Sequence, residues 1–363
     1  MFLGLRGFPH VQGGVEKHAE QLCPLLVEQG CQVDVIVRSN YQPDDIGSEW
    51  QCVKFHGLWA PKHKGLEAII HTFLGVLFAA IKRPDILHIH AIGPALMVPL
   101  ARVLGLKVVV THHGPDYDRQ KWGGFARTML KLGEYVGMRY ANARIVISKV
   151  IGDMVLNKHH VSSILIPNGV TLPTMPQSMT ALQELNLEEG KYVLLVSRLV
   201  PEKRHLDLIS AFRQSGLHGW KLALVGASDH PDDYVRALQR AVASFPEIVM
   251  TGYKSGLGLR ELYAHAGMFV LPSSHEGLPI AMLEALSYGL PVIASDIPAN
   301  LEVGLDADHY FKLGNIDDLA AHLKDFSTQQ LSAKQRSEIQ KWVAERYNWA
   351  EIAAKTMQVY HSI

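Results

Sequence analysis

Short apolar runs rich in β-branched residues alternate with helix-length segments along the whole chain. Continuous apolar strands separated by helices are typical of parallel sheets that helices cover on both faces. Two sets of such runs follow one another, so the pattern predicts an α/β fold with two doubly wound parallel-sheet domains. The first set is FLGL, QVDVIV, ILHIH, KVVVTHH and ARIVIS, and the second set is YVLLVSR, KLALVG, EIVMTG, MFVLPS and PVIAS.

The boundary between the two domains is expected at residues 168–179, NGVTLPTMPQSM, a stretch rich in Pro, Thr and Ser that suits a linker. A chain of 363 residues is also too long for one ordinary hydrophobic core. We therefore expect an N-terminal domain over residues 1–170 and a C-terminal domain over residues 171–344. Ligands of open α/β sheets bind beyond the carboxyl ends of the strands, so two facing sheets predict a cleft between the domains.

The balance of charges argues against a nucleic-acid partner. Lys and Arg together number 35, as do Asp and Glu, whereas a nucleic-acid binder normally shows a basic field. The three cysteines form no CxxC pair, which fits free thiols in a reducing compartment. The chain begins MFLGLRGFP, without the basic start and cleavage site of a signal peptide, so we expect a cytoplasmic protein.

The longest apolar run is AIIHTFLGVLFAAI, residues 68–81. It is shorter than the ~20 residues that a membrane-spanning helix needs. Basic residues flank the run on both sides, which leaves two interpretations open. It is either a core helix with basic ends, which we favour, or a segment that lies on a membrane surface. The flanking residues are Lys62, Lys64, Lys82 and Arg83.

Two loops that follow predicted strands could bind phosphate. Gly13 and Gly14 come before a helix expected to begin near Val15, and the free N–H groups of a helix N-terminus suit an anion. In SRLVPEK, Arg198 and Lys203 offer a planar fork and a compact point charge, which together suit a diphosphate. The alternatives are a tight strand-to-helix turn for the glycines and a solvated pair for the cations.

Two histidines and an aspartate follow the predicted strand KVVVTHH. His112 and His113 are adjacent, so their side chains point to opposite faces of the strand and only one of them easily reaches a ligand. The spacing His-His-x-x-Asp, which ends at Asp116, is weak for a metal, because a metal site needs further ligands in suitable geometry. We expect no metal here. A histidine that hydrogen-bonds a substrate and a buried structural histidine remain the two alternatives.

SSHEGLPIAMLEALSYG, residues 273–289, sets two carboxylates eight positions apart. Glu276 lies in a loop before a helix expected to start around Pro279, and the N–H groups of residues 277–280 can hold phosphate or a sugar oxygen. Glu284 lies about one and a half turns into that helix and is a good acceptor for paired sugar hydroxyls. One ligand that carries a diphosphate between two polyols would use both acids and both cations. A nucleotide sugar has that shape.

Over nearly its whole length, the chain resembles the retaining GT-B glycosyltransferases of family 4. The most specific match is PSSHEGLPIAMLEALSYGLPVIAS, which contains the Glu-x7-Glu signature of that family. The block THHGPDYDRQKWGGFA resembles the subset that builds bacterial surface polysaccharides. The other matching pieces are GGVEKH, IPNGV, SRLVPEK and TGY.

The resemblance implies two Rossmann-like domains and a division of labour between them. The C-terminal domain would bind a nucleotide-sugar donor, and the N-terminal domain, completed by a returning helix at residues 345–363, would bind the acceptor. Glu284 would bind the ribose, Glu276 the transferred sugar, and Tyr253 would lie near the base. The donor-binding residues would be Gly14, Arg198, Lys203, Tyr253, Glu276, Gly277, Leu278, Pro279, Ile280 and Glu284.

The resemblance also implies a chemistry. His113 would lie near the reacting carbon and act with Glu276 in catalysis, while His112 and Asp116 would lie on the acceptor side. No metal or other cofactor is expected, and retention would follow front-face attack in which the leaving phosphate takes the proton of the acceptor. Arg204 departs from the family, which usually carries glycine after the Glu-Lys pair.

The expected donor is a UDP-sugar, with GDP and dTDP open, and the expected acceptor is a saccharide or lipid-linked saccharide of polysaccharide biosynthesis. A lipid-linked acceptor implies an enzyme in the cytoplasm or peripheral at the inner face of the cytoplasmic membrane.

Several other functions can be weighed against this one. A nucleotide-sugar epimerase on the same fold is the main alternative, because it shares the diphosphate cradle. A dinucleotide oxidoreductase would need GxGxxG followed by an acid about 20 residues later, and neither half of the chain supplies that pattern. A sugar phosphorylase would need a lysine-bound pyridoxal cofactor, for which the sequence shows no distinct site. A binding protein without activity is disfavoured, because both acids and both cations are present.

Overall fold

The computed structural model describes residues 1–363 except 43–46, 62–65, 119–122, 229–232 and 330. The chain forms two compact units, which are described separately below. Unit 1 comprises Met1–Gly169 and Trp349–Ile363, and unit 2 comprises Val170–Asn348. The expected boundaries were residue 170 for the end of the first domain and residue 345 for the start of the returning helix; in the structure unit 1 ends at Gly169 and resumes at Trp349. Among the described residues, no helix has both the length and the apolarity to cross a bilayer.

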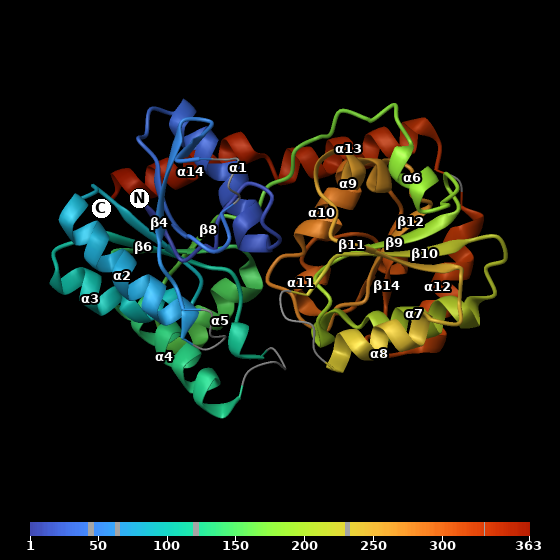
Figure 1. The fold of residues 1–363 in the computed structure, drawn as a ribbon, viewed down its shortest axis with the longest axis horizontal. Helices are drawn as coiled ribbons and strands as arrows, with labels where there is room; N and C mark the ends of the chain where they lie inside the picture. The colour runs from blue at the N-terminus through green and yellow to red at the C-terminus, as the bar shows by residue number, and fades with distance from the viewer. Residues whose placement is uncertain (43–46, 62–65, 119–122, 229–232, 330) are drawn as a thin grey trace. The chain divides into compact units, whose positions relative to one another are not determined.

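Unit 1 is built on an eight-stranded sheet with the order β3-β4-β2-β1-β5-β6-β7-β8 (Figure 1). Neighbouring strands are parallel except for the hairpin of β3 and β4. The central strands β5 and β6 are buried along their whole length, which explains their continuous apolar sequence. The strands are β1 (Phe2–Leu3), β2 (Asp34–Arg38), β3 (Glu49–Trp50), β4 (Val53–Leu58), β5 (Leu87–His90), β6 (Val108–His112), β7 (Ala143–Val146) and β8 (Ile164–Leu165).

Helices cover both faces of this sheet. Right-handed crossovers place the β1–β2 connection on one face and the β4–β5, β5–β6 and β6–β7 connections on the other. The first face carries α1 and α14, which pack together, and the second carries α2, α3 and α4. The helices are α1 (Gly14–Glu28), α2 (Glu67–Lys82), η1 (Pro94–Met97), α3 (Val98–Val103), η2 (Asp116–Asp118), α4 (Gly124–Tyr140), α5 (Lys149–His159) and α14 (Trp349–His361).

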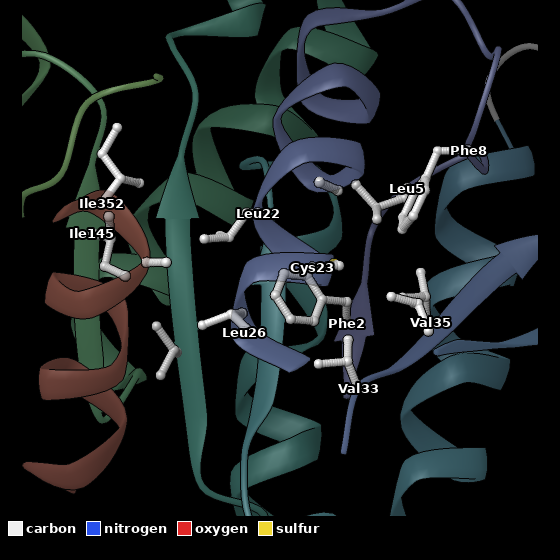
Figure 2. Packing of buried hydrophobic residues seen from close by; sticks show 14 of the residues in the cluster. Phe2, Leu5, Phe8, Leu22, Cys23, Leu26, Val33, Val35, Ile145 and Ile352 are labelled. Atoms are coloured by element: carbon white, nitrogen blue, oxygen red, sulfur yellow. The ribbon is translucent and has the colours of Figure 1, made fainter. Parts of the chain in front are cut away.

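The core under the first face joins the two ends of the chain. Figure 2 shows Leu22 of α1 and Ile352 of α14 in one cluster with Phe2 of β1 and Ile145 of β7. These side chains are almost completely buried, so the last helix of the chain completes the N-terminal unit. Burial of apolar surface stabilises this docking by ~25 cal/mol per Å².

Unit 2 is built on a six-stranded, entirely parallel sheet with the order β11-β10-β9-β12-β13-β14. The two sheets with their covering helices confirm the expected α/β fold with two doubly wound domains. The strands are β9 (Tyr192–Val196), β10 (Lys221–Val225), β11 (Ile248–Gly252), β12 (Met268–Leu271), β13 (Val292–Ser295) and β14 (Tyr310–Phe311). The helices are α6 (Thr180–Glu184), η3 (Pro201–Lys203), α7 (His205–Ser215), α8 (Asp233–Val242), α9 (Gly256–Ala264), α10 (Ile280–Ser287), α11 (Pro298–Leu301), η4 (Ala307–His309), α12 (Ile316–Thr328) and α13 (Ala333–Arg346).

All ten runs that the sequence predicted as strands contain a strand of the structure. The missed strands are short or lie toward the sheet edges. β4 has alternating buried and exposed residues rather than a continuous apolar run, because Lys54 and Gly57 are exposed. A strand with one wet face lacks the signal on which the prediction rested. The other missed strands, β3, β8 and β14, contain two residues each.

Candidate active site

In unit 2, two neighbouring strands bring together the loops that carry the predicted donor site. β9 and β12 are paired in parallel, so the segments that follow them leave the sheet at the same edge. The segment after β12 is tied to the segment after β9 at Ser274, whose backbone N and side-chain Oγ donate to the carbonyl oxygen of Glu202 at 2.8 and 3.2 Å. This contact joins Lys203 and Glu276, which are 73 positions apart in the sequence.

Lys203 and Glu276 form an ion pair in which the ammonium donates to Oε1 of the carboxylate. The two side chains are only 17% and 11% exposed. Burial alone would raise the pKa of Glu276, but the Lys203 charge and its hydrogen bond outweigh burial and hold that pKa below its usual range. The carboxylate is therefore ionised and can only accept hydrogen bonds.

Glu284 is oriented by a tyrosine. The hydroxyl of Tyr263, on α9, donates to Oε2 of Glu284 at 3.1 Å. Burial and the nearby Glu284 charge raise the pKa of Tyr263 well above its usual value, so the hydroxyl stays protonated and remains a donor. The Tyr263 ring stacks on Tyr288 with centroids 5.3 Å apart, which fixes its position. The sequence analysis missed Tyr263, because nothing in its spacing relates it to Glu284.

The helix after Glu276 begins at Ile280, one residue later than expected, with Pro279 as its N-cap. Within the part of the chain that the structure describes, the Pro279 side chain makes no capping hydrogen bond, and Met282 N already donates to the Pro279 carbonyl at 3.0 Å. The N–H groups of Ile280 and Ala281 are therefore the first-turn donors that a ligand can use. One expectation needs correction: Pro279 has no N–H and cannot donate to a phosphate, whereas Gly277, Leu278 and Ile280 can.

The segment after β9 carries three cations: Arg198 and Lys203, which were expected to bind phosphate, and Arg204, which is paired with an acid. Arg198 and Lys203 are both partly buried in this loop. Arg204 has a left-handed conformation, with φ at 51°, which glycine adopts at less cost. Its guanidinium turns to Asp207 on α7, with Nε 2.6 Å from Oδ2. This backbone conformation is a physical reason for the glycine that the resembling family carries here.

Glu202 and Tyr253 also lie in segments that follow strands of the unit 2 sheet. Tyr253 follows β11, which is one of the two edge strands of the sheet, and its side chain is 41% exposed. Glu202 is buried, and both of its carboxylate oxygens lack a hydrogen-bond partner among the described residues. The sequence analysis treated Glu202 only as part of the SRLVPEK motif. A buried carboxylate without a donor is unusual enough to mark this loop as strained or ligand-dependent.

In unit 1, the ion pair of Arg6 and Glu16 lies beside the loop that contains Gly13 and Gly14. Arg6 donates to Oε1 of Glu16 from its backbone N at 3.3 Å and from Nε at 3.1 Å. Burial would raise the pKa of Glu16, but the Arg6 charge and the hydrogen bonds to the carboxylate together outweigh burial and lower that pKa. A Cβ at Gly13 would displace the Glu16 carboxylate and the Arg6 guanidinium from their present positions. α1 begins at Gly14, one residue before the expected start, and its N-cap Gly13 supplies no side-chain hydrogen bond.

His113 belongs to a cluster of three histidines from three segments. Nε2 of His113 lies 3.0 Å from Nδ1 of His90, and Nδ1 of His18 lies 2.9 Å from Oδ1 of Asn168. Burial, and then the charges of neighbouring histidines, lower the pKa of His113 and His90 well below the usual value. Burial also lowers the pKa of His18 to about 4. The cluster is therefore neutral at pH 7, and a neutral ring can donate or accept a hydrogen bond.

The same three histidines are the group that could hold a metal among the described residues. They offer ring nitrogens that all lie within 4.8 Å of one another. A zinc ion ~2.0–2.1 Å from each nitrogen would need all three to lie roughly 3.4 Å apart. His90 and His113 instead pair with each other, and His18 is turned to Asn168. The cluster is hydrogen-bonded as it stands, but Asn168 occupies only Nδ1 of His18, so the absence of a metal stays a prediction.

His112 has a different place from the one expected. It is fully buried, and the backbone N–H of Gly114 donates to its Nδ1 at 3.0 Å. Its Nε2 therefore carries the proton and donates to Oε1 of Glu134 at 3.0 Å. Both ring nitrogens are used, so none is left for an acceptor. The expectation that His112 meets the acceptor is replaced by a structural role. The two adjacent histidines do point to different surroundings, as their spacing indicated.

Glu134, a fully buried carboxylate on α4, anchors the loop that follows β6. Besides His112 it accepts from the Tyr117 hydroxyl and from Nε2 of His159, both at 3.0 Å, and from Lys158. Burial opposes ionisation, but these donors lower the pKa of Glu134 to about 2. Asp116, which was expected on the acceptor side, lies in the pinned turn η2 and is partly buried. The sequence analysis missed Glu134, since its partners come from three other segments.

Two family models match adjacent parts of the chain. "Glycosyltransferase Family 4" matches residues 12–172, and "Glycosyl transferases group 1" matches residues 180–346. The O-antigen chain mannosyltransferase B of Escherichia coli is 28% identical over 197 residues, which is 52% of this chain and 51% of that protein. A UDP-Gal:α-D-GlcNAc-diphosphoundecaprenol α-1,3-galactosyltransferase of Escherichia coli is 26% identical over 230 residues, 60% of this chain and 59% of that protein. The matched stretches thus span little more than half of these two relatives.

A similar solved structure is that of HepE from Anabaena in complex with UDP and glucose. It superposes with a TM-score of 0.82 at 17% identity and covers 100% of this chain and 99% of that one. Identity this low shows the fold alone, and the fold is the expected GT-B architecture. The two family matches, the two parallel-sheet units and the Glu276–Glu284 segment agree with one another. The chain belongs to the family 4 glycosyltransferases.

Proposed function

We propose that this glycosyltransferase is a retaining, metal-independent enzyme that moves a sugar from a UDP-sugar to a saccharide or lipid-linked saccharide in polysaccharide biosynthesis. The observation that carries the proposal is the ionised pair of Lys203 and Glu276 beside the uncapped start of α10, with Glu284 farther along the same helix. A cation, helix N–H groups and two carboxylates together match a diphosphate between two sugars.

The donor would be held by charge and by hydroxyl recognition. Lys203 and Arg198 would take the diphosphate, and the N–H groups of Gly277, Leu278 and Ile280 would meet its oxygens. Glu284, held by Tyr263, would accept from the ribose hydroxyls. Tyr253 would lie by the base. In unit 1 the start of α1 at Gly14 is the further candidate for a phosphate contact.

The chemical step would be stabilised by the same charges. As the bond from the sugar carbon to the phosphate oxygen breaks, negative charge grows on UDP, and preorganised cations and N–H groups stabilise it without a metal. The acceptor hydroxyl would attack the same face of the sugar, and its proton would pass to the leaving phosphate. Glu276 would hold the hydroxyls of the transferred sugar. His113, kept neutral by burial and neighbouring histidines, would hydrogen-bond near the reacting carbon.

Two comparisons support the choice of donor and acceptor. HepE was solved with UDP and glucose, and the galactosyltransferase of Escherichia coli is named for a UDP-sugar donor and a diphosphoundecaprenol acceptor. An epimerase on the same fold stays the alternative, but no contact in the described residues favours it over the transferase.

Donor binding is tested by thermal shift with UDP, GDP, dTDP and ADP. A ligand that binds only the folded state raises the melting temperature, so we expect the largest shift with UDP. A larger shift with GDP would correct the base. No shift with any nucleotide, in a folded protein, would contradict the donor site.

The reaction itself is tested by NMR of the product and by chelation. A retaining transferase keeps the anomeric configuration of the donor sugar and needs an acceptor, whereas an epimerase converts the donor without an acceptor. We expect chelator to leave the rate unchanged, because the developing charge is met by Lys203, Arg198 and N–H groups. A strict metal requirement would refute that part of the proposal.

A further inference from the structure

One side of unit 1 exposes large apolar side chains in regular stripes. On α2, Phe73, Leu77 and Ile81 recur at every fourth position, which places them on one face of the helix. On α4, Phe125, Leu132 and Tyr135 recur at intervals of seven and three. Ile81 and Phe125 are 81% and 80% exposed. Single exposed apolar residues are ordinary, but stripes on neighbouring helices indicate an interaction surface.

These helices form one layer on the same face of the sheet. α3 contacts both α2 and α4, and the three helices lie together in Figure 1. Val103, which is 85% exposed, adds an apolar residue on α3, the helix that contacts both α2 and α4. We call the outward side of this layer the α2–α4 face.

The inner side of α4 explains why the helix keeps this orientation. Gly133 and Gly137 let α4 approach the turn η1, because a Cβ at either position would collide with Ile92 or Ala95. Glu134 anchors the same side through its buried hydrogen bonds. The packing therefore fixes which residues of α4 face outward.

The exposed charged residues on α2, α3 and α4 are all cations. The two acids on these three helices are turned away: Glu134 is fully buried, and Glu67 is paired with Arg38 at 3.3 Å and only 12% exposed. The nearest exposed acids along the chain, Asp85 and Asp118, lie in neighbouring turns. None of the outward cations is ion-paired with an acid within the described residues. Those cations are Lys82, Arg83, Arg102, Arg127, Lys131 and Arg139.

This concentration of positive charge contrasts with the formal net charge of the whole chain, which is zero. On α13 of unit 2, exposed cations alternate with acids, as in the pairs Lys334–Glu338 and Lys341–Glu345. On the α2–α4 face, by contrast, cations alternate with exposed apolar and aromatic residues. Basic side chains interleaved with apolar ones are the signature of helices that lie on an anionic lipid surface.

The same charge disfavours a second copy of the chain as the occupant. A two-fold dimer would bring this face against itself, so that cations would meet cations. We propose that the α2–α4 face docks on an anionic phospholipid bilayer. The apolar stripes would enter the boundary between headgroups and acyl chains, and the cations would meet lipid phosphates. The docking itself does not depend on the proposed function. Only its purpose does, because docking would bring unit 1 to a lipid-linked acceptor.

The sequence analysis considered this possibility only for the segment that ends at Arg83 and favoured a core helix. Half of that interpretation holds, because His71, Val76 and Ala79 of α2 are buried. The other half of the helix is exposed. The sequence analysis did not consider α4, whose stripe appears only once the structure shows which side Glu134 and the two glycines bury. Lys62 and Lys64 lie outside the described residues.

The first measurement is co-sedimentation of the full chain with phosphatidylcholine vesicles that contain or lack phosphatidylglycerol. We expect binding that requires phosphatidylglycerol and that weakens as salt screens the cations. The main variant is Arg127→Glu/Lys131→Glu/Arg139→Glu. Each cation near a charged membrane contributes about fivefold in affinity, so we expect a loss on the order of a hundredfold.

The matched control is Lys324→Glu/Lys334→Glu/Lys341→Glu on α12 and α13, which changes the net charge equally at exposed positions. It should keep vesicle binding. A second variant, Ile81→Ala/Phe125→Ala, removes exposed apolar area without opening the core and should weaken binding while the melting temperature stays the same. All variants should keep the shift in melting temperature with UDP.

Three outcomes would overturn the proposal: equal binding to both kinds of vesicle, no binding to either, or an equal loss in the control. A wild-type dimer that the main variant converts to a monomer, seen by sedimentation velocity, would assign the face to a second copy instead. The proposed function fails separately, because absent nucleotide shifts alongside intact vesicle binding would contradict the donor site and leave the docking face standing.

Discussion

At the scale of single residues, the two acids of the Glu-x7-Glu segment are held by different partners. Glu276 is paired with a cation, and Glu284 accepts from the Tyr263 hydroxyl. The environments fit the different roles proposed for the two acids: Glu276, beside Lys203, would contact the transferred sugar, and Glu284, farther along α10, would accept from ribose hydroxyls. Substitutions at the two positions should therefore separate binding from turnover.

We expect Glu284→Ala to weaken UDP binding by about tenfold to a hundredfold, because hydrogen bonds to a charged group contribute roughly 1.5–3 kcal/mol. Glu276→Gln should leave UDP affinity nearly unchanged and mainly lower kcat. Calorimetric titration with UDP and initial rates measure the two effects. Tyr263→Phe should give a smaller loss of UDP affinity, since it removes only the donor that orients Glu284. Equal effects of the Glu284 and Glu276 changes on binding would contradict this division.

Lys203 is proposed to bind the diphosphate and is paired with Glu276, so its substitution tests the phosphate role directly. We expect Lys203→Gln to weaken UDP binding while leaving uridine binding unchanged, because only UDP carries the diphosphate. The control is Arg204→Gly, whose guanidinium is paired with Asp207 and whose left-handed backbone suits glycine. It should bind both ligands like the wild type. A parallel loss for uridine and UDP in Lys203→Gln would mean a disturbed loop rather than a lost phosphate contact.

At the scale of elements, Glu134, a buried carboxylate on α4, positions the loop that follows strand β6. Glu134 on α4 joins His112 at the end of β6 and Tyr117 in η2 to His159 of α5. The loop that carries His113 and Asp116 is therefore fixed by a helix that no local motif connects to it. Four donors compensate the burial of this charge, so removing the charge leaves them unsatisfied.

We expect Glu134→Gln to lower the free energy of unfolding by about 3 kcal/mol, since breaking one side of a buried charged network leaves donors without a partner. The matched control is Glu189→Gln, whose carboxylate pairs with His265 but is 59% exposed. That change should cost less than about 1 kcal/mol. Urea unfolding followed by circular dichroism measures both. A loss in Glu134→Gln no larger than in the control would show that the network contributes little.

At the scale of the whole molecule, several buried histidines are neutral in the folded state. Burial lowers the pKa of His18 and His71 to about 4 and that of His205 to about 3. In the unfolded chain these groups titrate near 6.5. Below that pH the unfolded state binds more protons than the folded state, so stability rises with pH and falls on acidification.

We therefore expect the free energy of unfolding to fall between pH 7 and pH 5. One such histidine contributes about 2 kcal/mol to this difference. His71→Leu tests the contribution of a single group, because leucine does not titrate. The variant should show a fall smaller by about that amount in urea unfolding at the two pH values. An unchanged pH dependence would mean that His71 is protonated in the folded protein or stays neutral in the unfolded one.

The sequence predicted the fold class and most strands because a strand buried on both faces needs a continuous apolar run. β5 and β6 show this pattern and were found, whereas β4 has one exposed face and was missed. Of the site, the sequence predicted the loop residues, because the carboxyl ends of parallel strands are where ligands bind. It did not predict the pairing of Lys203 with Glu276, since strand order decides which loops become neighbours.

The sequence by itself determined the two α/β units, the loops that bear chemistry and the chemical types they offer, because periodicity and residue type are local properties. Only the tertiary structure decided how these groups are held. His112 donates to the buried carboxylate of Glu134, and Glu284 accepts from the Tyr263 hydroxyl. The outward side of α4 is determined by Gly133, Gly137 and Glu134, which pack on its inner side. These outcomes depend on contacts between distant segments. The role of a carboxylate or histidine depends on the burial, charges and hydrogen bonds that its neighbours in the fold provide.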